Sequence, residues 1–97
     1  MQVRLSDEQL FTIKELAKKI FNTNSVWIFG SRANSMQKGG DIDIYIETNK
    51  TKEILQSKIE FLREFEKCYG EQKVDLIVNN GLENREIYQV ARQGVKL

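Results

Sequence analysis

Residues 41–47 alternate between polar and apolar side chains without a break, and this pattern constrains the fold more than any other. Because successive side chains of a strand point to opposite faces, the pattern predicts a β-strand with one face in the core. Three isoleucines share the core face, and the other face carries Asp41, Asp43, Tyr45 and Glu47. Asp41 and Asp43 are then about 6.6 Å apart along the strand, at ~3.3 Å per residue. Glu47 would lie about 13 Å from Asp43, so we exclude it from a shared site.

The rest of the chain predicts two more strands and three helices around this strand. Apolar residues at helical spacing predict three helices, and apolar β-branched runs predict two strands. The expected order is helix 7–21, strand 25–29, loop, strand 41–47, helix 51–69, strand 73–78 and helix 82–93. This order predicts an α/β (α+β) fold in which a small mixed three-stranded sheet packs with about three helices.

Capping and packing signals refine these elements. Ser6 and Gln9 have the spacing of a capping box at the start of the first helix. Asn80 and Glu83 have the same spacing before the last helix, whose Ile87 and Val90 we expect to point inward. The strand over 25–29 has no polar interruption, which predicts cover on both faces. We therefore expect its two aromatic residues to lie in the core rather than to stack on a nucleotide base.

Composition narrows the setting. A chain of 97 residues is expected to form one domain, residues 1–97, and to bury roughly 60–70% of its unfolded surface. Fifteen Lys and Arg against 14 Asp and Glu leave a net charge of +1, which gives no general attraction to nucleic acid. The single cysteine, Cys68, cannot form an internal disulfide and fits a reducing compartment. No apolar stretch approaches the ~20 residues of a membrane span, so we expect a cytoplasmic protein.

A glycine-serine turn and three carboxylates carry the chemistry of the sequence. Gly30 permits close approach of a ligand to the backbone, and the Ser31 hydroxyl with nearby amides can donate to phosphate oxygens. Arg32 either neutralises phosphate or pairs with a nearby acid. Asp75 interrupts the apolar run 74–78, and it joins the acids of strand 41–47 if the two strands are neighbours. The chain has no histidine, so carboxylates are left to bind metal, which suits Mg²⁺.

These segments resemble the signature of the DNA polymerase β nucleotidyltransferase superfamily. The matching segments are Gly30-Ser31-Arg32-Ala33, Asp41-Ile42-Asp43-Ile44 and Val74-Asp75-Leu76. The short length is similar to that of the minimal nucleotidyltransferase (MNT) branch. The resemblance implies that Asp41 and Asp43 bind two Mg²⁺ ions, and that Asp75 completes one metal site and helps to deprotonate the attacking hydroxyl. It also implies that Gly30 and Ser31 hold the β- and γ-phosphates of the nucleotide.

The sequence departs from the family pattern in the loop between the glycine and the acids. Gly40 stands where members often have serine, the loop is about one residue shorter than usual, and Asn34-Ser35 replaces a pairing that ends in glycine. These changes are expected to loosen phosphate contacts and leave the three carboxylates intact.

The resemblance implies an enzyme that transfers AMP from ATP to a hydroxyl group. Larger relatives carry a further domain for the acceptor, so we expect a separate partner to present it here. MNT proteins pair with small helical HEPN-domain proteins in toxin–antitoxin modules, where the MNT antitoxin attaches AMP to a tyrosine of the toxin. Two alternatives stay open: a nucleotide-binding module that inhibits its partner sterically, and the catalytic half of a two-chain transferase acting on a small molecule.

Overall fold

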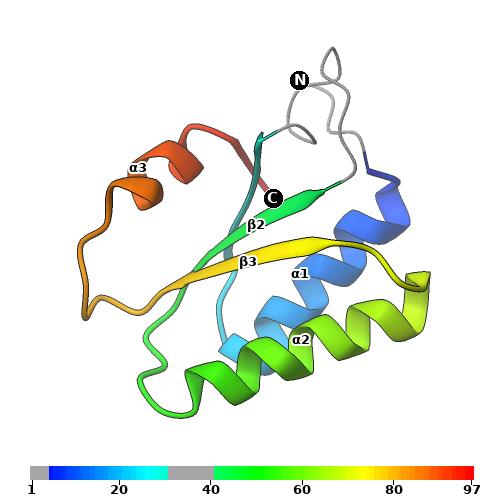
Figure 1. Ribbon diagram of the computed structural model, residues 1–97, viewed down its shortest axis with the longest axis horizontal. Helices are drawn as coiled ribbons and strands as arrows, with labels where there is room; N and C mark the ends of the chain where they lie inside the picture. The colour runs from blue at the N-terminus through cyan, green and yellow to red at the C-terminus, as the bar shows by residue number, and fades with distance from the viewer. Residues whose placement is uncertain (1–4, 31–40) are drawn as a thin grey trace.

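The protein consists of a mixed β-sheet with helices on both faces (Figure 1). The structure is a computed structural model, which describes residues 5–30 and 41–97. The elements follow one another as α1 (Asp7–Phe21), β1 (Ser25–Phe29), β2 (Ile42–Glu47), α2 (Ile54–Tyr69), β3 (Val74–Asn79), α3 (Glu86–Arg92) and β4 (Val95–Lys96). This confirms the mixed α+β class and the expected order of the three helices. None of the described helices combines the length and the apolarity needed to cross a membrane.

Within the described residues the sheet has four strands, in the order β3-β2-β1-β4. Strand β1 pairs antiparallel with β2 and β4, whereas β2 and β3 are parallel. The prediction of three strands is therefore wrong by one, because it missed β4. This strand is only two residues long, too short for a periodic pattern, and it forms by pairing with Trp27 and Ile28 of β1. The backbone N–H of Leu97 extends the pairing with a 2.9 Å hydrogen bond to the Val26 carbonyl.

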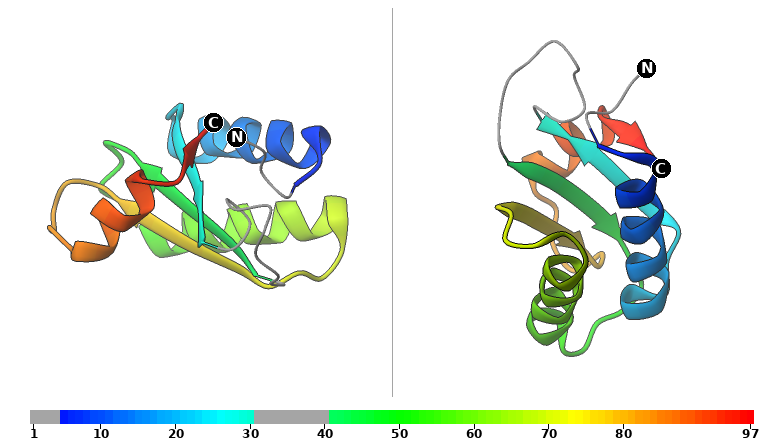
Figure 2. Two further views of the ribbon diagram at one scale, coloured as in Figure 1. Left: turned by 90° about the horizontal axis from the view of Figure 1, so that it is seen from above. Right: turned by 90° about the vertical axis from the view of Figure 1, so that its right-hand side faces the viewer.

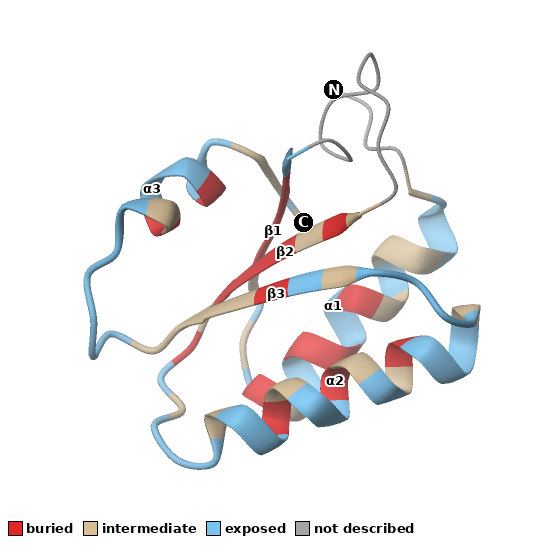
Figure 3. Ribbon diagram, in the orientation of Figure 1, coloured by how far each residue is buried: buried red, intermediate tan, exposed pale blue. Residues whose placement is uncertain are grey.

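The larger hydrophobic core lies between the sheet and the helices α1 and α2, which cover the same face (Figures 2 and 3). Ile42, Ile44 and Ile46 are fully buried in it, which confirms the predicted core face of β2. The two helices run antiparallel, since Phe21 contacts Phe61 while Thr12 hydrogen-bonds Tyr69. Burial of aliphatic and aromatic side chains of this size stabilises a fold by about 1.5–3 kcal/mol each.

The short helix α3 covers part of the opposite face with a smaller core. This core consists of Trp27, Phe29, Tyr45, Tyr88 and Ala91. Strand β1 is therefore covered on both faces, and its two aromatic residues are buried, as the sequence predicts. The expectation that Val90 points inward is wrong, because its side chain is 55% exposed on the outer side of α3.

Helix boundaries follow the local capping chemistry. Helix α1 has the predicted box: the Gln9 N–H donates to Ser6 Oγ, and the Ser6 N–H donates to Gln9 Oε1, both at 3.0 Å. Helix α2 begins three residues later than predicted, because Glu53 adopts a left-handed conformation with φ of 56°. Helix α3 begins four residues late, because Asn80 Oδ1 accepts from the nearby Leu82 N–H in a turn.

Candidate functional site

The parallel register of β2 and β3 places Asp43 directly beside Asp75. Both residues are on the sheet face that also carries Tyr45 and α3, opposite to the larger core. The two side chains are close enough for the charge of Asp75 to act on the pKa of Asp43. Asp41 precedes Asp43 by two residues, so the three predicted acids lie at the same end of the sheet. The condition on which the prediction depended, that the two strands are neighbours, is met.

Electrostatics at this cluster are unbalanced. Burial raises the pKa of Asp43 above its ordinary value of 3.8, and the nearby charges of Asp75 and then Asp41 raise it further. The cation closest to the cluster in the described part of the chain is Lys73, whose Nζ lies 3.7 Å from Asp41 Oδ2. Carboxylates that lie this close repel each other when charged, and a cation bound between them relieves the repulsion.

The donor set fits a hard cation. It offers carboxylate oxygens, the ligands that Mg²⁺ prefers, and the chain has no histidine. Across residues 5–30 and 41–97, no three acidic or cysteine side chains already converge in the manner of a finished metal site. Asp43 and Asp75 are adjacent, whereas Asp41 is turned toward Lys73. Asp41 would therefore exchange this ion pair for a metal ion.

Gly30 makes room for the Asp43 carboxylate. It follows β1 with a φ of 73°, a conformation that glycine adopts without strain. A Cβ atom at this position would collide with Asp43 Oδ2. The predicted phosphate-binding residues Ser31 and Arg32 lie outside the described residues, as do Asn34, Ser35 and Gly40, so their roles stay predictions.

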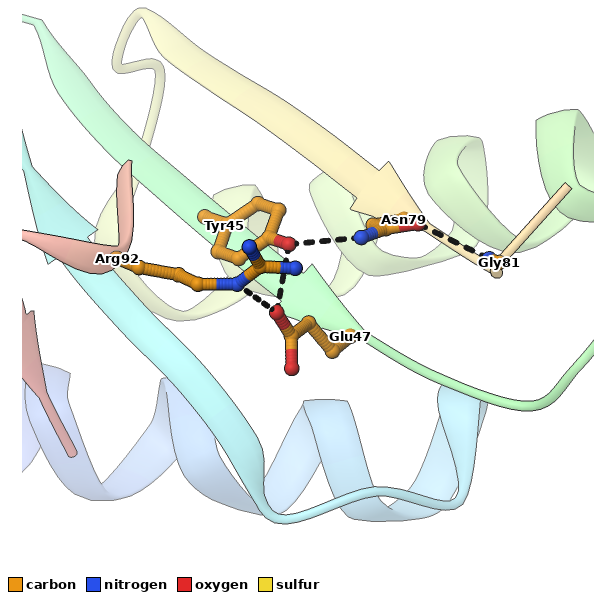
Figure 4. A network of polar contacts seen from close by, with 5 residues as sticks. All are labelled: Tyr45, Glu47, Asn79, Gly81 and Arg92. Atoms are coloured by element: carbon orange, nitrogen blue, oxygen red, sulfur yellow. Dashed lines mark hydrogen bonds and ion pairs between the residues drawn. The ribbon is translucent and has the colours of Figure 1, made fainter. Parts of the chain in front are cut away.

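A polar network fixes α3 over the same sheet face (Figure 4). The buried Tyr45 hydroxyl donates to Glu47 Oε2 at 2.8 Å and accepts from Asn79 Nδ2 at 2.9 Å. Arg92 of α3 donates from Nε to the same Glu47 oxygen, and its guanidinium lies over the Tyr45 ring. The Gly81 N–H donates to Asn79 Oδ1 and ties the following loop to the network. Sequence reasoning missed this network, since only the shared face of Tyr45 and Glu47 is visible from spacing.

The network sets the ionisation of its own members. Burial raises the pKa of Glu47, but hydrogen bonds from Arg92 and Tyr45 lower it by more, so it lies below the ordinary value. Burial raises the pKa of Tyr45, which keeps its hydroxyl protonated as a donor. Glu47 is thus held in a structural ion pair with Arg92.

A polar pocket of about 360 Å³ lies at the other end of β2 and β3, beyond the network. Amide and hydroxyl side chains dominate its lining, and its charged members Glu47 and Arg92 already bind each other. The unbalanced carboxylates lie at the opposite strand ends, so the acid cluster is the candidate site.

Comparison with known families identifies the family of the chain. The family described as "Polymerase beta, Nucleotidyltransferase" matches residues 12–97, which includes every element from the middle of α1 onward. The sheet and its clustered acids therefore belong to a nucleotidyltransferase-type domain, and the chain is a member of this family. The resemblance read from the sequence motifs is confirmed at this level. No curated protein matches the sequence significantly.

Proposed function

We propose that the protein is a Mg²⁺-dependent nucleotidyltransferase that moves AMP from ATP to a hydroxyl group of a partner protein. The observation that carries the proposal is the in-register pair of Asp43 and Asp75 on a sheet face beside Gly30. The pKa of Asp43 is raised in part by the charge of Asp75, so the repulsion between these two acids opposes folding. Their adjacency therefore does not serve the stability of the fold. Binding of a metal ion and of phosphate would explain why these two acids lie side by side.

The reaction is an in-line displacement at phosphorus. The acceptor hydroxyl oxygen forms a bond to the α-phosphorus, the bond from this phosphorus to the bridging oxygen breaks, and pyrophosphate leaves. Asp41, Asp43 and Asp75 would hold two Mg²⁺ ions, which stabilise the charge on the attacking and leaving oxygens when bound. Gly30, Ser31 and Arg32 would hold the β- and γ-phosphates. Asp75 is exposed, so an acceptor hydroxyl can reach its carboxylate and pass its proton there.

The proposed acceptor is a tyrosine of a small helical HEPN-domain protein in the cytoplasm. The support is the resemblance to the minimal branch of the family, in which such pairs form toxin–antitoxin modules. The protein would then act as the antitoxin and form a hetero-oligomer with its target. The open position of Asp75 on the sheet is compatible with a protein-sized acceptor.

A second candidate is a nucleotide-binding module that blocks its partner without turnover. The ion pair between Asp41 and Lys73 favours it, because a lysine that holds a metal ligand weakens metal binding. An enzyme that binds metal through Asp41 must break this pair, whereas a module that does not use Asp41 as a ligand need not.

Labelled ATP separates the two candidates. The protein is incubated with Mg²⁺, ATP labelled at the α-phosphate and lysate of its source organism, beside the Asp41→Asn/Asp43→Asn variant. A labelled protein band with the wild type alone supports transfer, and mass spectrometry of the band identifies the modified residue. Absence of label, together with a rise in Tm on adding ATP and Mg²⁺, supports the binding module. Equal labelling by the Asp41→Asn/Asp43→Asn variant would contradict the assignment of the acid cluster as the active site.

A further inference from the structure

The two edges of the sheet differ in how they are protected. Strand β4 ends one edge with two residues, one of which is Lys96. Short strands and lysine are common devices against unwanted strand pairing. The other edge is β3, which is six residues long and, among residues 5–30 and 41–97, pairs with β2 alone. Its only charged residue is Asp75, and it contains no proline.

The hydrogen-bonding groups on the β3 edge can be assigned from its pairing with β2. The carbonyls of Lys73 and Asn79 accept from the N–H groups of Ile42 and Thr48 on the β2 side. Backbone groups alternate in direction along a strand, so the odd-numbered residues of β3 face β2. The N–H and C=O groups of Val74, Leu76 and Val78 therefore point away from the sheet.

This open row of donors and acceptors passes directly beside the candidate site. Asp75 lies between Val74 and Leu76, and its side chain is on the face that carries Asp43. A strand added to β3 would lie ~4.8 Å away, with alternate side chains on that same face. A hydroxyl-bearing side chain of the added strand would then stand next to Asp75, at the distance of a cross-strand neighbour. Ile77, half-buried on this face, offers an apolar contact to the next side chain.

We infer that the protein binds its acceptor as an extended segment that pairs with β3 and presents a hydroxyl side chain to Asp75. The inference rests on the proposed function and specifies how a protein acceptor is recognised. Main-chain hydrogen bonds supply the affinity in this mode, and the alternating side chains supply the selection. The occupant is a flexible or extended part of the partner, such as a chain terminus or loop, rather than a helix surface.

The test uses a defined peptide probe, acetyl-Lys-Thr-Val-Tyr-Val-Thr-Lys-amide, with the full protein. The matched control peptide has the same sequence with its three central amides N-methylated, which removes backbone donors and keeps the side chains. Amide exchange of the protein is followed by NMR. At a peptide concentration about ten times its Kd, exchange at Leu76 and Val78 is expected to slow about tenfold. The methylated peptide is expected to leave both amides unchanged.

A protein variant gives an independent test of the same edge. Val78→Pro removes an outward N–H and leaves the β2 ladder intact, a position where edge strands tolerate proline. It is expected to weaken peptide binding more than tenfold, whereas Val78→Ala, which loses side-chain atoms but keeps the N–H, binds the peptide as the wild type does. Should Val78→Pro fail to fold, the peptide pair on the wild type decides alone. Equal protection by both peptides, protection elsewhere, or no protection would overturn the inference.

Label transfer to the peptide tyrosine separates this inference from the proposed function. Protection of the edge without transfer of labelled AMP contradicts the proposed function and retains strand addition. Equal transfer to both peptides supports the function and contradicts strand addition. Light scattering measures whether the protein forms a dimer. If the wild type is a dimer and Val78→Pro is a monomer, the β3 edge pairs with a second copy of the chain, and the inference is overturned.

Discussion

Gly30, at the end of β1, leaves open the space that the carboxylate of Asp43 on β2 occupies, because a Cβ atom at position 30 would overlap Asp43 Oδ2. This contact links the phosphate-binding turn expected at Gly30 to the acid cluster. A side chain at position 30 would displace the carboxylate as well as strain the backbone, and these two effects can be separated.

Gly30→Ala is expected to abolish transfer and to destabilise the fold, with about 1–2 kcal/mol of the cost coming from the left-handed backbone. Gly81→Ala is the matched control, because Gly81 has a similar φ of 84° but open space where its Cβ would lie. The two variants are compared by urea unfolding and by label transfer. Equal loss of stability together with full activity in Gly30→Ala would contradict the role of the contact.

Asp43→Asn is expected to raise the Tm at pH 7 in the absence of Mg²⁺, although it removes activity. The folded-state pKa of Asp43 is raised, so loss of its proton opposes folding as pH rises through that pKa. Below the ordinary value of 3.8, Asp43 is protonated in the folded and unfolded states, and the advantage of the variant disappears. Tm measured from pH 3 to pH 8 tests this; a wild type more stable than the variant at neutral pH would contradict it.

Lys73→Met is expected to tighten Mg²⁺ binding, because Asp41 loses its competing cation. The Lys73 side chain is largely exposed and that of Asp41 is partly exposed, so the gain is limited to about fivefold, the equivalent of a surface ion pair of ~1 kcal/mol. Titration calorimetry with Mg²⁺ measures it, and Lys67→Met, which alters an ion pair on α2, is the control. Weaker binding in Lys73→Met would show that Lys73 supports the site instead.

Tyr45→Phe is expected to destabilise the protein by about 1–3 kcal/mol, because Glu47 and Asn79 lose a buried hydrogen-bond partner. A double-mutant cycle that combines Tyr45→Phe with Glu47→Gln measures the coupling free energy between Tyr45 and Glu47. Urea unfolding gives the free energies of unfolding of the wild type, the two single variants and the double variant. Additive effects would contradict the network as a cooperative unit.

The contribution of Glu47 to the stability of the fold is expected to depend on pH in the opposite sense to that of Asp43. Its folded-state pKa is lowered, so the stability it adds is present above its ordinary value of 4.5 and is lost as pH falls through the folded pKa. The difference in Tm between wild type and Glu47→Gln should therefore shrink below pH 4.5. A difference that stays constant down to pH 2 would contradict the ion pair with Arg92 as its source.

Elements encoded by local patterns could be predicted from the sequence. The alternation in β2 and the capping box of α1 depend on neighbouring residues, and both match the structure closely. The start of α3 was wrong, because a turn stabilised by Asn80 replaced the expected cap. Strand β4 was missed because it exists only through its pairing with β1.

The candidate site was predictable in its members but not in its geometry. Residue types and spacing identified Asp41, Asp43 and Asp75, whereas the register that sets Asp43 beside Asp75 is a property of strand pairing. The ion pair of Lys73 with Asp41 and the network of Arg92 join residues distant in sequence. No pattern within a single element contains these contacts.

The unequal cover of the two sheet faces has a consequence for how such a domain diversifies. Helices α1 and α2 hold the larger core, while among residues 5–30 and 41–97 the acid-bearing face is covered by the seven-residue helix α3 alone. Substitutions of exposed residues on the acid-bearing face therefore disturb fewer buried contacts than substitutions in the larger core do. Exposed residues around the acids can therefore vary while the scaffold beneath stays as it is.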